Sequence, residues 1–220
     1  MPALIAKTLA WLLLLSFCWL GPTAGAWWPM AWGVLAVYGL VVLAAFGLVD
    51  HELLKERAHP AAGSDPVDKW YALAGTLLLY PATLLVAGFD HAADWSAPIP
   101  FWLQLLGLKW FAVGYTLVLW AMATNRFFTS VVRMQGERGH HVVDRGPYAW
   151  VRHPGYAGTS IAHLALPLAL GSWWALIPAI CGCWLFIPRL FAEERRLLAH
   201  LQGYREYRQA VNKHLIPQIW

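Results

Sequence analysis

The sequence predicts an all-α fold: a polytopic helical membrane protein with about five to six transmembrane helices and a C-terminal amphipathic helical tail. Hydrophobic residues make up 59% of the 220 residues and charged residues only 13%, against about 25% in soluble domains. Too few polar residues remain to cover a water-facing surface. The apolar residues also gather into runs of roughly 20, which is the length of helix that crosses a hydrocarbon core of about 30 Å.

Six runs are long and apolar enough to be predicted as crossings. They are Leu4–Leu20, Trp28–Val49, Trp70–Phe89, Phe101–Ala123, Ala157–Leu170 and Trp173–Phe191. Only Gly171-Ser172 separates the last two runs, which predicts a tight hairpin, and Pro167, Pro178 and Pro188 predict kinks in them. No repeat divides the chain, so we expect one integral membrane domain.

The first run has an alternative interpretation that stays open. Lys7, the apolar run and the small residues that end at Ala26 also fit a cleaved signal peptide. We favour a retained helix because everything downstream is membrane-embedded.

The distribution of Lys and Arg predicts the orientation of the helices. The segments Asp50–Lys69 and Asn125–Arg152 and the C-terminal tail carry these residues, whereas the loops Gly21–Trp27 and Asp90–Ala97 carry none. Positive residues favour the cytoplasmic side, so we expect both termini in the cytoplasm, with the bacterial inner membrane as the location. Lys109 is the exception, and we expect its long side chain to reach the outer interface.

The C-terminal tail is predicted to form two amphipathic helices at the membrane surface. Leu197, Leu198, Leu201 and Tyr204 recur at helical spacing beside charged residues. Gly203 interrupts the pattern, and a second short helix is expected to end near His214. The basic residues here are placed to contact anionic lipid head groups.

Several classes of function are disfavoured by composition. The net charge of +4 is modest and no basic run is interleaved with aromatic residues, so we expect no nucleic-acid binding. His140, His141 and His153 lack a carboxylate at ligand spacing, so no metal site is expected. The cysteines, Cys18, Cys181 and Cys183, lie in apolar runs and are interpreted as packing residues.

The stretch "GPYAWVRHPGYAG", residues 146–158, is the strongest candidate for a binding site. Tyr148, Trp150 and Tyr156 offer ring faces to an adenine or, through cation–π attraction, to a sulfonium. Its glycines let the backbone approach a ligand closely. An interfacial aromatic belt is the structural alternative, but a belt does not explain Arg-His-Pro directly before a helix.

Other polar residues are less informative on their own. Arg189 and Glu193 are four residues apart on one helical face, and spacing alone favours an ordinary salt bridge between them. Glu194, with Arg195 and Arg196, is expected to be solvated or lipid-facing. His163 lies inside a predicted crossing, where a functional histidine and a hydrogen-bonded packing histidine remain equal alternatives.

The C-terminal motifs together resemble a known superfamily. "HHVVDRGPYAWVRHPGYAG", "RLFAEER" and "GYREYRQAVNKHLIP", in this order, are similar to the isoprenylcysteine carboxyl methyltransferase and phospholipid methyltransferase superfamily of integral membrane enzymes, in its bacterial type. The resemblance covers Gln135–Trp220, and residues 50–70 also look like a segment of bacterial members. It implies a four-helix N-terminal part, residues 1–123, and a cofactor-binding methyltransferase core, residues 124–220.

The resemblance also implies a cofactor and its site. S-adenosylmethionine would lie in a cytoplasm-facing pocket, with Arg189 and Glu193 as the catalytic residues and Arg189 turned to the acceptor. The implied cofactor-binding residues are Gln135, His140, His141, Val142, Val143, Tyr148, His153, Pro154, Gly155, Tyr156 and Glu193.

The function implied is methyl transfer to a membrane-embedded or lipophilic acceptor: an isoprenylcysteine-like carboxylate, a phospholipid amine or a small thiol. Two alternatives stay open. One is an NADPH-dependent membrane reductase of the sterol-reductase type, which shares a similar Arg-His-Pro-x-Tyr arrangement. The other is a non-enzymatic membrane scaffold, which would bind no cofactor.

Overall fold

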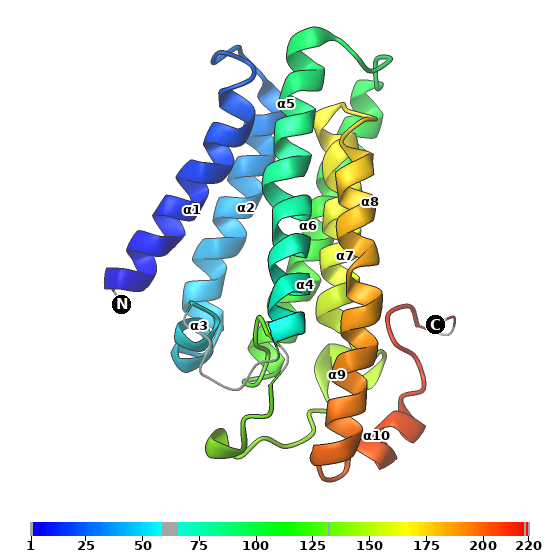
Figure 1. Ribbon diagram of the computed structural model, residues 1–220. Coiled ribbons are helices and arrows are strands. Elements are labelled where there is room, and N and C mark those ends of the chain that lie inside the picture. Colours follow the sequence, from blue (N-terminus) through cyan, green and yellow to red (C-terminus); the bar gives the residue numbers. More distant parts are fainter. Residues whose placement is uncertain (1, 59–65, 132, 218, 220) are drawn as a thin grey trace.

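The computed structural model describes residues 2–58, 66–131, 133–217 and 219, and in these residues the fold is entirely helical (Figure 1). The helices are α1 Pro2–Leu20, α2 Pro29–Leu48, α3 His51–Ala58, α4 Pro66–Leu77, α5 Thr83–Ala93, α6 Phe101–Thr124, α7 Pro154–Leu170, α8 Leu176–Trp184, α9 Phe186–His200 and α10 Tyr204–Ala210. This confirms the predicted fold class. Residues 59–65 of the predicted Asp50–Lys69 loop lie outside the described residues.

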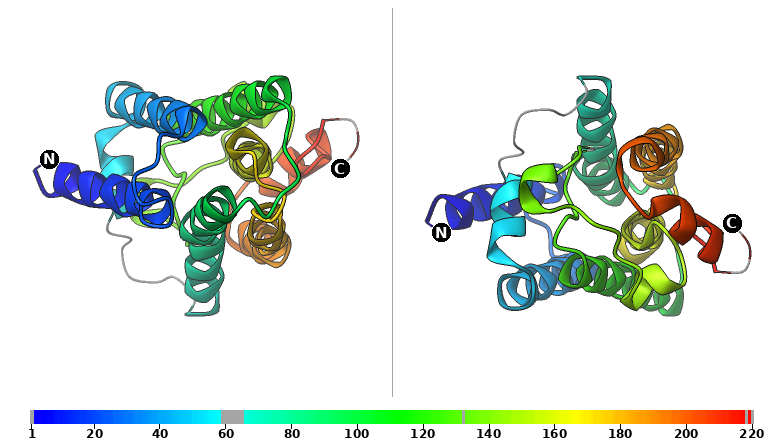
Figure 2. Two further views of the ribbon diagram at one scale, coloured as in Figure 1. Left: turned by 90° about the horizontal axis from the view of Figure 1, so that it is seen from above. Right: turned by 90° about the horizontal axis from the view of Figure 1, so that it is seen from below.

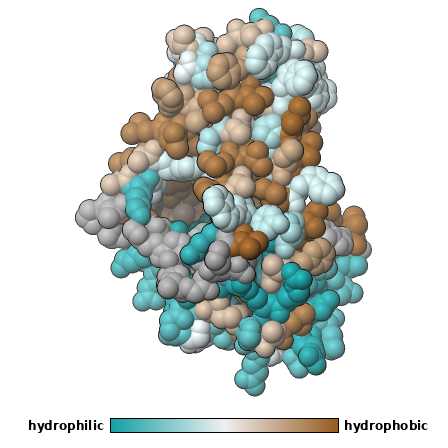
Figure 3. All heavy atoms as spheres, viewed as in Figure 1, coloured by the Kyte–Doolittle hydropathy of each residue, from teal (hydrophilic) through white to brown (hydrophobic). Residues whose placement is uncertain are grey.

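Four described helical runs are long and apolar enough to cross a membrane: Pro29–Leu48, Val67–Ala93, Phe101–Thr124 and Leu176–His200. The apolar part of α1, Leu4–Leu20, is shorter. On the face drawn in Figure 3, hydrophobic side chains predominate over the body of the molecule, whereas hydrophilic side chains gather at one end. That end contains α3, the segment between α6 and α7, and α10 (Figure 1). The basic segments therefore lie together, as the Lys and Arg asymmetry predicted; which side of the membrane they face stays a prediction.

Two of the predicted crossings are interrupted at prolines. The run predicted from Trp70 to Phe89 contains a π-helical turn at Leu78–Ala82, around Pro81. The last crossing breaks between α8 and α9 at Leu185. Pro188 lies four residues after Trp184, and a proline ring clashes with the carbonyl four residues before it, which explains the break.

The tail differs from its prediction in one respect. Leu197 and Leu198 belong to α9, which continues without interruption to His200, so the end of the last crossing and the first tail helix are one element. Gly203 then turns the chain with a φ of 80°, and α10 follows. One amphipathic helix, not two, therefore stands apart from the bundle.

α7 is the central helix of the bundle and lies among α5, α6 and α8 (Figure 2). Its contact with α6 is made by small residues. A Cβ placed on Gly114 would lie 2.5 Å from the Ala162 nitrogen, and one on Gly107 would lie 2.5 Å from the Ala169 nitrogen. Small residues are how membrane helices bring their backbones together, since apolar side chains gain little from leaving lipid.

We expect Gly114→Ala to lower the free energy of unfolding by about 1–3 kcal/mol, because the added methyl group must push two backbones apart. Gly47→Ala in α2 is the matched control, since a Cβ there meets nothing within 4 Å. Removing that glycine should leave stability unchanged or raise it by up to about 1 kcal/mol. Thermal unfolding in detergent compares the two, and equal melting of both variants would contradict the packing argument.

Candidate active site

A cavity of about 840 Å³ opens at the boundary between the apolar body and the hydrophilic end, where the face drawn in Figure 3 is hollowed. One part of the cavity is lined by apolar side chains and the other part by more polar ones. Apolar side chains of α1, α2 and α4, among them Trp11, Val41 and Leu73, line one part. Loop and tail residues line the other. A cavity of this kind can hold a lipophilic molecule and a polar one together.

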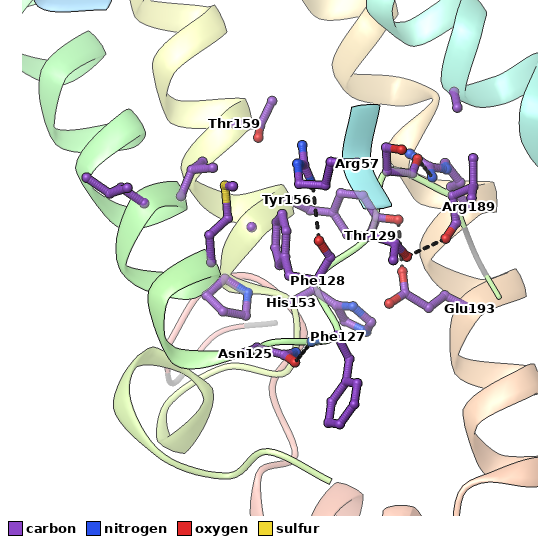
Figure 4. A pocket seen from close by; sticks show the side chains of 18 of the residues that line it. Arg57, Asn125, Phe127, Phe128, Thr129, His153, Tyr156, Thr159, Arg189 and Glu193 are labelled. Carbon is purple, nitrogen blue, oxygen red and sulfur yellow. Dashed lines mark hydrogen bonds between the residues drawn. The ribbon is translucent and has the colours of Figure 1, made fainter. Parts of the chain in front are cut away.

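The structure brings almost all of the predicted site residues to this cavity. His140, His141, Val142, Val143, Tyr148, His153, Pro154, Gly155, Tyr156, Arg189 and Glu193 line it. They come from the α6–α7 segment, the start of α7 and the middle of α9 (Figure 4). Gln135 does not line the cavity. Its fully buried amide donates to the Phe127 carbonyl at 2.8 Å, so it orders the loop behind the site.

The polar part of the site is built on Tyr156 and Glu193. The Tyr156 hydroxyl donates to Glu193 Oε2 at 2.9 Å, which joins the first turns of α7 to α9. The Arg189 guanidinium lies 5.9 Å from the Tyr156 ring centroid. Its ion-pair partner is Asp68 of α4, with Nε to Oδ1 at 2.8 Å, rather than Glu193. Arg189 also donates to the Ser130 carbonyl at 2.6 Å, so it joins three segments at the cavity wall.

His140 is held as a neutral donor. Burial and the neighbouring His141 lower the pKa of His140 to about 4, so its imidazole carries no charge at neutral pH. The Gln135 backbone N–H donates to His140 Nδ1 at 3.4 Å, which leaves the ring proton on Nε2. The imidazole therefore presents one N–H group at the cavity wall.

The prediction that Glu194 is solvated or lipid-facing was wrong. Glu194 is 4% exposed. Its Oε1 accepts from Arg152 Nε at 2.5 Å and lies 3.2 Å from His153 Nε2, and its Oε2 lies 3.3 Å from His214 Nε2. A buried charge persists where such partners surround it. Glu194 therefore ties α9 to the start of α7 and to the tail.

The tail closes over the site through its backbone. Lys213 and His214 accept hydrogen bonds from the Arg152 and His153 backbone N–H groups, each at 2.9 Å. The Tyr207 hydroxyl donates to the Tyr148 carbonyl at 2.8 Å. Burial raises the pKa of Tyr207, so it stays a donor at neutral pH. These bonds hold α10 against the loop that lines the cavity.

The glycines of residues 146–158 pack closely against other parts of the protein. A Cβ on Gly155 would lie 2.3 Å from the Phe128 ring, and one on Gly158 would lie 2.6 Å from the Gly114 carbonyl oxygen. Gly146 adopts a φ of 59° in a turn against Thr124. Each glycine makes room for another part of the protein, and Gly155 also lines the cavity.

His163 lies outside the large cavity. It is fully buried, and its Nδ1 lies 2.9 Å from the Thr159 carbonyl and its Nε2 3.4 Å from the Tyr115 hydroxyl. Both ring nitrogens are thus engaged within the bundle. This arrangement favours the packing alternative for His163.

Sequence reasoning missed several cavity residues of the N-terminal half. Arg57 of α3, Tyr38 of α2 and Tyr80 in the π-helical turn all line the cavity. The eight residues of α3 are too few and too polar to have been predicted as a membrane helix. The Glu-Arg pair that ends "ELLKER" was the available signal, because it places charge directly between two membrane helices.

Known proteins match both the sequence and the fold. The model of the isoprenylcysteine carboxyl methyltransferase (ICMT) family matches residues 105–199. A probable protein-S-isoprenylcysteine O-methyltransferase of Oryza sativa subsp. indica is 29% identical, over 72% of this chain and 82% of the relative. Protein-S-isoprenylcysteine O-methyltransferase of Homo sapiens is 33% identical, over 65% of this chain and 54% of the relative.

Two further matches extend this picture. Lamin-B receptor of Drosophila melanogaster is 28% identical, over 66% of this chain but only 22% of the receptor. The solved structure of the eukaryotic intramembrane Ras methyltransferase ICMT has a similar fold, with a TM-score of 0.54 and 22% identity over 90% of this chain and 68% of that one. The chain thus spans only part of several of these relatives.

Helices, cavity and comparisons define the class: an integral membrane protein of the polytopic α-helical type. Its sequence is similar to the isoprenylcysteine carboxyl methyltransferase family and to protein-S-isoprenylcysteine O-methyltransferases, as its C-terminal motifs predicted, and its fold is similar to that of a solved member. None of these matches carries the name of a reductase, so the reductase alternative gains no support.

Proposed function

We propose that this chain transfers the methyl group of S-adenosylmethionine to a lipophilic acceptor dissolved in the membrane. The cavity with two kinds of lining carries the proposal. Its polar part lies among the loop and tail residues, where a water-soluble cofactor can enter, and its apolar part lies among α1, α2 and α4. The basic end of the molecule is proposed to face the cytoplasm.

The residues of the polar part fit the cofactor. The Tyr204 hydroxyl lines the cavity, is buried, and has no hydrogen-bond partner in the described part of the protein, which suits a ligand polar atom. Glu193 supplies a negative charge for an ammonium or sulfonium group, and the rings of Tyr148 and Tyr156 supply faces for a cation or an adenine. The His140 Nε2–H group adds a donor.

S-adenosylmethionine supplies a methyl group that is already activated by the positive charge on sulfur. The protein's contribution is then positioning and exclusion of water. Tyr156 fixes Glu193 by its hydrogen bond, and Arg189 lies at the cavity wall where the acceptor would arrive. A carboxylate acceptor needs no base, whereas an amine would need Glu193 to take its proton.

The named relatives favour the carboxylate. Those of Oryza sativa and Homo sapiens are protein-S-isoprenylcysteine O-methyltransferases, and the matching family is named for methylation of a carboxyl group. We extend this to the present chain as a proposal: its acceptor is a lipophilic carboxylate of the isoprenylcysteine type.

Cofactor binding is tested by thermal unfolding with S-adenosylmethionine, S-adenosylhomocysteine and NADPH in detergent. A ligand at 100 times its Kd should stabilise the wild-type protein by about 2.7 kcal/mol. We expect Glu193→Gln and Tyr156→Ala to weaken S-adenosylhomocysteine binding about ten-fold or more, because each removes one partner of the pair that holds the polar part of the site. Glu52→Gln, an exposed position of α3 outside the cavity, is the control. Equal affinity in all three variants would exclude this cofactor site.

A further inference from the structure

Arg57 is a cation of the cavity wall that the methyltransferase assignment leaves without a role. It lies on α3, outside the region 105–199 that the family model matches, and it lines the cavity beside Phe128 and Tyr156 (Figure 4). Its NH1 donates to the Phe128 carbonyl at 3.3 Å. Its guanidinium lies 5.1 Å from the Phe128 ring centroid. Both contacts hold the side chain in place, but neither supplies a negative charge.

The neighbouring arginines differ from Arg57 because their charges are compensated. Arg189 pairs with Asp68 at 2.8 Å. Arg133 pairs with Glu56, the residue next to Arg57, at 2.8 Å. In the described ranges, no carboxylate lies within 4.0 Å of Arg57. Among the residues that the structure describes, no carboxylate thus balances the positive charge of Arg57 at the cavity wall.

Such an arrangement is unfavourable unless something else supplies the anion. Burial, together with the positive charge of Arg189, lowers the pKa of Arg57. A guanidinium nevertheless remains protonated in proteins. A cation removed from water without a counter-charge destabilises the fold, and the same cation becomes a strong partner for an anionic ligand. The planar fork of arginine matches a carboxylate in particular, with two parallel N–H···O bonds.

We propose that Arg57 binds the carboxylate of the lipophilic acceptor and sets the preference of the site for an anionic acceptor; this rests on the proposed function. Arg57 holds the acceptor carboxylate while a carboxylate oxygen forms the new bond to the methyl carbon of S-adenosylmethionine. The carbon–sulfur bond breaks and its electron pair stays on sulfur, so an ester and a neutral thioether result and no proton moves. The ester carries no charge, so its attraction to Arg57 is lost and the product can leave.

The test compares Arg57→Gln with Lys55→Gln, which removes the same charge from an exposed position of the same helix. The probes are an N-acetyl-S-farnesylcysteine and its carboxamide, used in detergent with methyl-labelled S-adenosylmethionine. We expect the wild-type protein to bind the carboxylate at least ten times more tightly than the carboxamide. Arg57→Gln should raise the KM for the carboxylate about 10- to 100-fold and remove this discrimination. Lys55→Gln should behave as wild type.

The affinity for S-adenosylhomocysteine separates the possible failures. If the wild-type protein does not bind it, the proposed function itself is wrong. If it binds normally but the carboxylate is not preferred, or Arg57→Gln keeps the preference, the role of Arg57 is wrong. Arg57→Lys provides a second variant should the Gln protein not fold. It retains the charge without the fork, and we expect an intermediate KM with unchanged cofactor affinity.

Discussion

Glu194→Gln is expected to lower the free energy of unfolding by about 3–5 kcal/mol, since removing one partner of a buried ion pair leaves the other charge uncompensated. Arg152 is the charge left behind: its side chain is 2% exposed and its Nε lies 2.5 Å from Glu194 Oε1. Glutamine has nearly the shape of glutamate but no charge, so the substitution tests the electrostatic part of the network. Thermal unfolding in detergent measures the loss.

The same variant should also release the tail. His153 and His214 both contact Glu194, and their backbones hold the tail against the cavity loop. Trypsin should therefore cut Glu194→Gln faster in the tail than it cuts the wild-type protein. Glu206→Gln, on exposed α10 surface, is the control and should change neither property. Wild-type melting and cleavage in Glu194→Gln would show that this network is not structural.

The membrane helices could be predicted from sequence because hydropathy and length determine them almost residue by residue. Phe101–Ala123 was predicted and Phe101–Thr124 is observed. Trp28–Val49 was predicted and Pro29–Leu48 is observed. The π-helical turn around Pro81 could not be predicted in the same way, because a proline in a membrane helix can be accommodated by several local arrangements and neighbouring helices select among them.

The site was only partly predictable, for a different reason. The motif residues reach the cavity because they are close in sequence and begin a single helix, α7. The partners that define their roles are distant: Glu194 lies 42 residues from Arg152, and Asp68 lies 121 residues from Arg189. Glu194 precedes Arg195 and Arg196, so local pattern indicated a solvated face. The family resemblance already pointed to Glu193, which lines the cavity, but only the tertiary fold shows that the adjacent Glu194 is buried in an ion-pair network.

Arg189→Lys is expected to lower turnover by about ten-fold or more while leaving cofactor affinity nearly unchanged, because a misplaced acceptor loses the advantage of orientation. Arg189 Nε reaches Asp68 at 2.8 Å while its NH2 reaches the Ser130 carbonyl at 2.6 Å. A planar fork can make both bonds at once, whereas a lysine ammonium is a single point of charge. The substitution therefore keeps the charge but loosens the wall where α4, α9 and the cavity loop meet.

Three measurements separate a role in the reaction from a purely structural one. Turnover with methyl-labelled S-adenosylmethionine and the farnesylcysteine carboxylate reports on the acceptor, S-adenosylhomocysteine affinity reports on the cofactor, and the melting temperature reports on the fold. If Arg189 acts on the acceptor, Arg189→Lys loses turnover without a matching loss of melting temperature. If Arg189 only forms the ion pair with Asp68, Arg189→Lys should keep most of the turnover and most of the melting temperature. Arg189→Ala should then lower stability and turnover together. Full turnover in Arg189→Lys would leave Arg189 as a structural ion pair and would remove it from the reaction.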